Sequence, residues 1–235
     1  MKTRIIPGTL GVEHPSVKRV LEIAEEILRK NKVLNIEKLY NLAKNRLKIP
    51  RNGLLSIIQF LINKKILIEG SKFSKETVLS NHIRNRIYNY IRIHPGVHFS
   101  ILRKKALPEE TGSSGQLIWH LELLLKFNYI RKIKVGHYTV FLPNDMDEET
   151  GRVLFILRDQ INYKLIRLLC EKEFIIKSEV YKELNEKRED VYYRVNNLLE
   201  YNIITESSEK NIQINPSIKE VFFQVIFMKI NIEEI

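Results

Sequence analysis

The chain has 235 residues, of which 44% are hydrophobic, and a formal net charge of +11, so it holds enough apolar sequence for one domain or up to three small ones. Its single cysteine, Cys170, excludes a disulfide within the chain and a cysteine-based zinc finger. No run approaches the roughly 18 apolar residues of a membrane span, and residues 1–12 lack the apolar core of a signal peptide. We therefore expect a cytoplasmic protein with no membrane contact.

The positive charge is unevenly distributed along the sequence. Residues 1–79 carry 16 Lys and Arg against 7 Asp and Glu, residues 80–143 carry 10 against 3, and residues 144–235 carry 13 against 18. An AT-rich genome would enrich lysine everywhere, but it would not explain the scarcity of acidic residues in the middle segment. The first two segments are therefore expected to bind a polyanion.

The first segment, residues 15–79, has the pattern of three helices and a hairpin. Pro15 suits the first position of a helix, and a second helix is expected over residues 36–47. A third helix runs from about residue 50 to 64, and residues 66–73 are expected to form a short hairpin. This order predicts a winged helix.

Two parts of this region have unusual sequences. Residues 1–14 show no periodicity and are expected to be an N-terminal arm. The third helix is apolar on nearly all sides at residues 54–62, which predicts burial against a neighbouring domain or a second copy of the chain. Base reading by this helix is not expected.

The middle segment, residues 80–143, has the clearest pattern. A first helix carries residues 83–91 and stops at His94-Pro95-Gly96, and a shorter second helix begins near Ser100. A turn cluster occupies residues 108–112.

A third helix and a hairpin complete this segment. Ser113 or Ser114 can cap the helix, which runs to about Asn128. Residues 130–134 and 138–142 then alternate between apolar and polar positions across a short turn, which indicates a β-hairpin. Helix, helix, turn, helix and hairpin is the order of a winged helix-turn-helix.

The last segment, residues 144–235, is expected to repeat this order. Residues 152–173 read as one long helix or as two helices broken near Asn162. Two further helices, a hairpin within residues 203–214 and a last helix from Pro216 follow. The chain is therefore predicted to be mainly α with short β wings, as three tandem winged helix-turn-helix domains of roughly 65 to 70 residues, too long for solenoid repeats.

Three motifs of the middle segment carry a family resemblance. His94-Pro95-Gly96, His98-Phe99-Ser100 and Trp119-His120-Leu121 resemble the corresponding motifs of archaeal winged-helix transcriptional regulators. The preceding stretch, residues 71–80, is similar to the connector of archaeal proteins with several winged helices. The resemblance implies sequence-specific DNA binding, although winged helices also serve as protein-binding modules.

The expected DNA contacts follow from the helical spacing. Leu117, Leu121 and Leu124 must face the core, which turns the polar positions of the third helix outward. Serines at the helix N-terminus suit a phosphate, Gln116 suits an adenine edge, and basic residues of the other elements suit the backbone. The candidate DNA-binding residues are Arg84, Arg86, Lys104, Lys105, Ser113, Ser114, Gln116, Trp119, His120, Arg131, Lys132, Lys134, His137 and Tyr138.

Two functions remain open on this evidence. The first is a regulator that binds double-stranded DNA, with a third domain for dimerisation or partner contacts. The second is a protein-protein scaffold of tandem winged helices, similar to ESCRT-II or basal-transcription subunits. Neither a glycine-rich phosphate loop nor the spacing of a metal or catalytic motif is present, so no enzyme, metal or cofactor is expected. A homodimer, or a protein partner on the first or third domain, is compatible with both functions.

Overall fold

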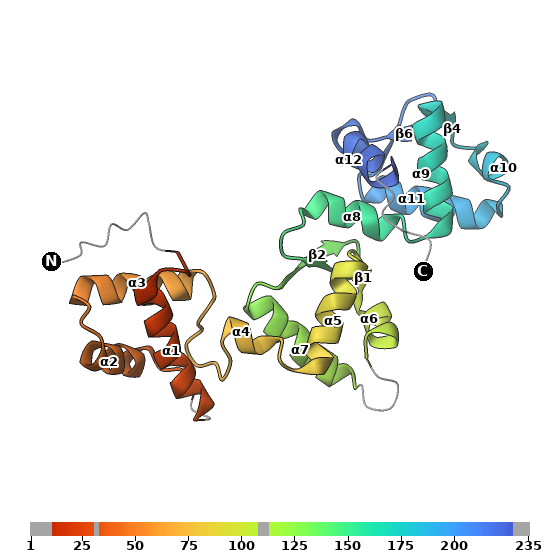
Figure 1. The fold of residues 1–235 in the computed structure, drawn as a ribbon. Helices are drawn as coiled ribbons and strands as arrows, with labels where there is room; N and C mark the ends of the chain where they lie inside the picture. Colours follow the sequence, from red (N-terminus) through yellow and green to blue (C-terminus); the bar gives the residue numbers. More distant parts are fainter. Residues whose placement is uncertain (1–10, 31–32, 108–112, 228–235) are drawn as a thin grey trace. The chain divides into compact units, whose positions relative to one another are not determined.

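The computed structural model describes residues 11–30, 33–107 and 113–227 (Figure 1). The described chain is mainly helical and has two small antiparallel sheets. It divides into two compact units, residues 1–86 with 113–129 and residues 87–112 with 130–235. Most of the expected arm and the expected turn at residues 108–112 lie outside the described residues, and the domain boundaries at residues 79/80 and 143/144 remain predictions.

Three helices form the core of the first unit: α1 (Pro15–Arg29), α2 (Ile36–Arg46) and α3 (Arg51–Asn63). Pro15 begins α1 as expected. The side chain of Asn35 caps α2 by accepting a hydrogen bond of 2.8 Å from the backbone N–H of Lys38. Apolar residues from all three helices pack together, and Val17, Leu39 and Ile57 are fully buried.

The hairpin expected at residues 66–73 is absent, and that prediction is wrong. Ile66 and Leu67 are instead buried in the helical core. The backbone that follows pairs with Leu34, through bonds from Leu34 N to Ser71 O and from Gly70 N to Leu34 O, and Ser71 N also bonds to Ile68 O. With its apolar residues in the helical core, the described segment forms these bonds in place of a strand ladder.

Helix α3 buries one face and leaves the rest partly exposed. Leu54, Ile57 and Leu61 are buried, whereas Leu55 is 45% exposed. Cover of the remaining apolar surface by another domain or a second copy stays a prediction.

The connector folds into a short helix, α4 (Lys75–Val78). Ser74 and Thr77 exchange hydrogen bonds in a capping box at its start. Tyr129, just after α7 (Ser114–Lys126), donates its hydroxyl to the carbonyl of Lys75 at 2.6 Å. This bond fixes the end of α7 to the connector within the first unit.

The second unit contains the hairpin of the middle segment and a third strand beside it. The hairpin strands are β2 (Ile130–Val135) and β3 (Tyr138–Pro143), as expected. Strand β1 (Val97–His98) pairs with β3, giving the order β1-β3-β2. This strand lies between α5 (His82–Ile93) and α6 (Phe99–Lys105), and it was not expected because two residues show no period.

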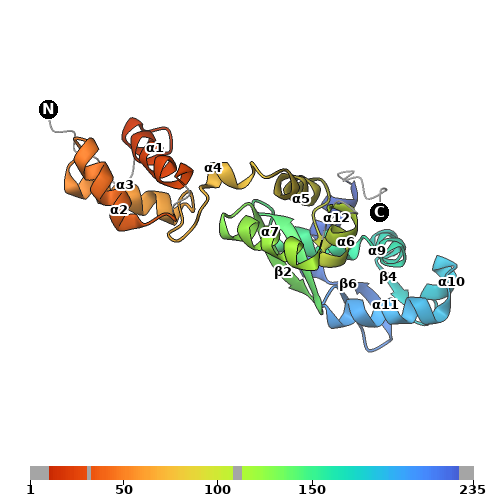
Figure 2. The ribbon, with the colours of Figure 1, turned by 90° about the horizontal axis from the view of Figure 1, so that it is seen from below.

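The last segment has the same order of elements. Of the two expected alternatives, one long helix or two, the structure has two helices, α8 (Glu148–Ile156) and α9 (Gln160–Lys172), and Asp159 caps the second. Its remaining elements are β4 (Phe174–Ile176), α10 (Val180–Leu184), α11 (Arg188–Glu200), β5 (Ile204–Glu206), β6 (Asn211–Ile214) and α12 (Pro216–Phe227). The sheet order β4-β6-β5 repeats that of the first sheet. Strands β4 and β6 lie beside α9 (Figure 2), and α12 packs against α8 and α9 (Figure 1).

Helix α8 packs closely on the first sheet. Gly151 of α8 lies so near Leu142 of β3 that a Cβ at this position would overlap the leucine side chain. Phe155 and Tyr201 also cover the apolar side of the hairpin. The hairpin and the last segment therefore share one packed region.

Candidate nucleic-acid interface

Helix α7 is positioned by its cap and by a row of leucines. Ser113 is the cap residue, and its hydroxyl accepts a hydrogen bond of 3.1 Å from the backbone N–H of Gln116. Leu117, Leu121 and Leu124 are buried, as their spacing predicts. The opposite side of the helix is therefore turned to solvent.

The first turn of α7 suits an anion. It contains no acidic residue, so the positive end of the helix dipole is not neutralised locally. Ser114 and Gln116 are partly exposed there, and Ser113 is exposed while its hydroxyl is engaged as the cap. A phosphate or a base edge is the chemical partner that these groups fit.

Arg84 does not lie on the surface, which corrects its assignment as a DNA contact. It is 1% exposed, and its guanidinium carbon lies 4.8 Å from the ring centroid of Phe73 and 5.2 Å from that of Trp119. Its Nε and Nη1 atoms have no hydrogen-bond partner within the described residues. Burial lowers the pKa of this guanidinium. Arg84 is a packing residue that holds Trp119, which itself stays 49% exposed.

His120 is also buried, which corrects its assignment in the same way. It is 2% exposed, and neither ring nitrogen finds a hydrogen-bond partner in the described chain. Burial lowers the pKa of the imidazole, and the positive charge of Arg84 lowers it further. A neutral side chain inside the domain cannot reach a phosphate without rearrangement.

The hairpin presents two lysines on its outer side. Lys132 and Lys134 are exposed and alternate with the buried residues Ile133 and Val135. Arg131 is engaged: it donates to the carbonyl of Met146 at 3.0 Å and lies 3.9 Å from the carboxylate of Glu148. The charge and exposure of the two lysines suit a phosphate backbone.

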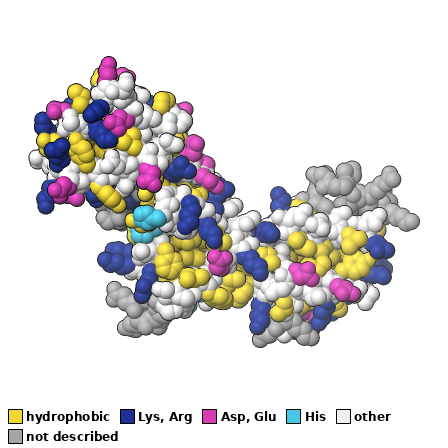
Figure 3. Space-filling view, turned by 180° about the vertical axis from the view of Figure 1, so that it is seen from behind, with side chains coloured by type: hydrophobic (Ala, Val, Ile, Leu, Met, Phe, Trp, Pro, Cys, Tyr) yellow, Lys and Arg dark blue, Asp and Glu magenta, His cyan; other side chains and the backbone are white. Residues whose placement is uncertain are grey.

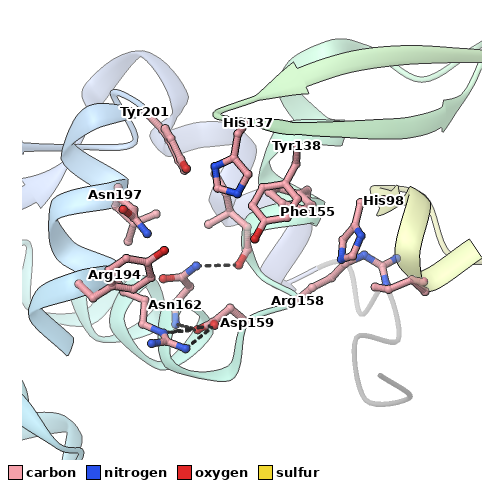
Figure 4. Close-up of a pocket in the computed structure, with 14 residues that line it drawn as sticks. His98, His137, Tyr138, Phe155, Arg158, Asp159, Asn162, Arg194, Asn197 and Tyr201 are labelled. Carbon is pink, nitrogen blue, oxygen red and sulfur yellow. Dashed lines mark hydrogen bonds and ion pairs between the residues drawn. The ribbon is translucent and has the colours of Figure 1, made fainter. Parts of the chain in front are cut away.

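The tip of the hairpin is placed differently from the two lysines. His137 and Tyr138 are exposed, but the Tyr138 ring lies 5.3 Å from Phe155 and 5.4 Å from His98. Both tip residues line a cavity (Figure 4). Their role in DNA binding remains a prediction.

The other basic residues are exposed on two helices. Arg86 lies on α5, and Lys104 and Lys105 lie in the last turn of α6. Arg103 is exposed in the same turn and was missed, although the run Arg103-Lys104-Lys105 in the sequence was a sufficient signal. On the face shown in Figure 3, Lys and Arg side chains are dispersed among apolar patches rather than gathered in one cluster.

Helix α11, which holds the place of α7 in the last segment, has the opposite electrostatic character. Glu189 and Asp190 occupy its first turn. Carboxylates at a helix N-terminus neutralise the dipole and repel a phosphate. The middle segment is therefore the better candidate for nucleic acid.

Comparison with known proteins places the chain beside HTH-type regulators. The family model HTH_HVO_0163_N, an N-terminal HTH domain, matches residues 81–154. The chain is 31% identical over 160 residues to MJ1398 of Methanocaldococcus jannaschii, whose name describes it as an uncharacterized HTH-type transcriptional regulator. The match covers 67% of this chain and 39% of that relative. In the described part of the chain, no helix is long and apolar enough to cross a membrane.

Proposed function

Because the chain belongs to the archaeal winged helix-turn-helix transcriptional regulators, we propose that it binds duplex DNA mainly through α7 and the β2–β3 wing of residues 80–143. The observation that carries the proposal is the first turn of α7, which is capped by Ser113 and free of acidic residues. A helix of this kind can present its N-terminal residues to the major groove.

The proposed contacts divide into two groups. Ser114 and Gln116 approach the groove, where the amide of Gln116 can pair with an adenine edge. Exposed basic residues neutralise phosphates without reading sequence, namely Arg86, Lys104, Lys105, Lys132 and Lys134. Arg84 and His120 support α7 from inside and make no contact with DNA.

The flanking segments have separate proposed roles. Residues 15–79 form a winged helix that has lost its wing, and their excess of basic residues adds phosphate contacts. Residues 144–235 form the third winged helix, with α12 added. Their acidic balance and the acidic start of α11 favour dimerisation or protein contacts over DNA binding.

Binding to random-sequence duplex DNA across a salt series tests the proposal. The wild type is expected to lose affinity steeply as salt rises, since bound phosphates release counterions. Lys132→Glu/Lys134→Glu should weaken binding at every salt concentration and flatten the slope. Lys187→Glu/Arg188→Glu is the control, because it reverses the charge of two exposed residues at the start of α11. This variant should change neither the affinity nor the slope. Absence of salt-sensitive binding at low ionic strength would refute DNA binding.

One observation favours the scaffold function as the second candidate. Ile118 is 51% exposed on the outer side of α7, beside the exposed Trp119. Aromatic and aliphatic side chains together on an exposed helix face are typical of protein interfaces. If Ile118→Gln abolishes binding of a partner protein while DNA binding is absent, the scaffold function replaces the regulator.

A further inference from the structure

A cavity of about 350 Å³ lies within the second unit (Figure 4). Its walls come from the β1–α6 region, the tip of the wing, the α8–α9 junction and α11. In Figure 4, His137 and Tyr138 project from the wing on one side, and Asn197 of α11 and Tyr201, just after α11, project from the other. Four elements far apart in sequence therefore form one hollow.

Arg158 gives this cavity a positive charge that no carboxylate of the described residues compensates. One terminal nitrogen donates to the carbonyl of Pro95 at 2.9 Å, and Nε is buried without a hydrogen-bond partner in the described chain. No carboxylate of the described residues forms an ion pair with it. Burial lowers the pKa of this guanidinium, as expected for a cation without a counter-ion.

The second arginine of the cavity is already neutralised. Arg194 forms hydrogen bonds with both carboxylate oxygens of Asp159, at 2.9 to 3.2 Å. Asp159 is the one carboxylate that lines the cavity, and it also accepts two backbone N–H groups at the start of α9. No acidic group of the lining therefore remains to pair with Arg158.

Aromatic rings line the same cavity as Arg158. Tyr138 lies 5.3 Å from Phe155 between ring centroids, and His98 lies within 6.2 Å of both rings. Tyr193 lines the cavity and is 60% exposed, and Asn162 Oδ1 is buried with no hydrogen-bond partner among the described residues. A flat ring can stack on these surfaces, and the amide oxygen can accept a hydrogen bond from it.

We propose that this cavity is a binding site for a small organic anion that carries a planar ring. Arg158 holds the anionic group, and the aromatic side chains of the wing tip and α8 hold the ring. The volume falls at the lower end of the range of small-molecule pockets. A nucleoside monophosphate and an aromatic carboxylate share this chemistry, and both are small enough to be tested as probes.

Calorimetric titration of the full chain without DNA tests the site independently of the proposed DNA binding. The probes are adenosine 5′-monophosphate and 4-hydroxybenzoate. The first is compared with adenosine and with inorganic phosphate, and the second with phenol. At least one complete probe should bind ten-fold or more tightly than its parts. The probe that binds then distinguishes a phosphate ligand from a carboxylate.

Two variants locate the binding, and one controls for it. Arg158→Met should weaken the complete probe ten-fold or more. Tyr193→Ala, at an exposed position where loss of folding is not expected, should weaken it several-fold. Arg188→Met, on the exposed start of α11 outside the cavity, should leave affinity unchanged. The proposal is overturned if no probe binds, if phosphate alone binds as well as the complete probe, or if both cavity variants bind like the wild type.

Discussion

Two opposing free-energy contributions act on the charge of the buried Arg84. Its guanidinium lies between the rings of Phe73 and Trp119, which favours the charge by up to about 2 kcal/mol. Its burial, with two nitrogens that have no hydrogen-bond partner among the described residues, disfavours the charge by at least as much. The methylene groups of the side chain, however, fill space between packed elements, and this packing stabilises the fold.

The balance at Arg84 can be measured with two substitutions. Arg84→Met keeps the volume and removes the charge, so the free energy of unfolding should stay within about 1 kcal/mol of the wild type or rise. Arg84→Ala leaves a cavity and should lower it by about 2–4 kcal/mol. Urea denaturation measures both. Equal destabilisation by the two variants would show that the charge itself is required.

The buried His120 should make the free energy of unfolding depend on pH. Its pKa in the folded chain is lowered below the ordinary histidine value of 6.5, mainly by burial. The unfolded chain therefore binds a proton at this side chain more readily than the folded chain does. The contribution of the neutral imidazole to the free energy of unfolding is complete above pH 6.5 and is lost as the pH falls below 6.5. Midpoints of urea denaturation between pH 5 and 8 should decline towards acid in the wild type.

The matched variant for this prediction is His120→Phe. It removes the titrating group, so the decline towards acid should be weaker. Part of the decline should persist, because burial also lowers the pKa of His98. An unchanged pH dependence in His120→Phe would rule out His120 as its source.

At the scale of elements, the wing tip is fitted to α11. Gly136 has a φ of +57°, and a Cβ there would overlap the ring of Tyr201, which follows α11. Gly136→Ala should therefore lower the free energy of unfolding by about 2–4 kcal/mol, from backbone strain and overpacking together. In a Tyr201→Ala background the overlap disappears, and a cost of about 1–2 kcal/mol from the positive φ should remain. Thermal or urea denaturation of the four proteins gives this cycle, and additive costs would contradict the contact.

The elements that sequence predicts well are those with a long period or a cap. Helices α1, α5 and α7 each show one apolar face over at least three turns, and β2 alternates between exposed and buried residues from Lys132 to Val135. Strand β1 has two residues and no period, so it is visible only through its pairing with β3. The prediction of a wing at residues 66–73 was wrong for a related reason. Apolar residues in so short a segment suit a helical core as well as a strand.

The candidate site divides in the same way. The exposure of Lys132 and Lys134 follows from strand alternation, and the cap at Ser113 follows from its position. The burial of Arg84 does not follow from helical spacing, because a charged residue is expected outside until aromatic partners enclose it. The cavity beside Arg158 is built from segments distant in sequence and gives no local signal at all.

At the scale of the whole molecule, charge separates the segments. The first two segments are basic and the last is acidic, although every segment is rich in lysine. Long-range attraction to DNA depends on this net balance, whereas recognition depends on individual side chains. We therefore expect the first segment to raise affinity for any duplex, without base reading by its largely apolar third helix.

The contribution of the first segment leads to the last prediction. Lys48 and Arg51 are exposed at the start of α3, whose first turn has no acidic residue. Lys48→Gln/Arg51→Gln should weaken binding to all duplex sequences alike and reduce the slope of log affinity against log salt by about one unit per charge removed. Lys187→Gln/Lys210→Gln, an exposed pair in the acidic segment, is the control and should change neither quantity. Fluorescence anisotropy with two unrelated duplexes measures both, and a loss confined to one duplex would instead assign sequence reading to α3.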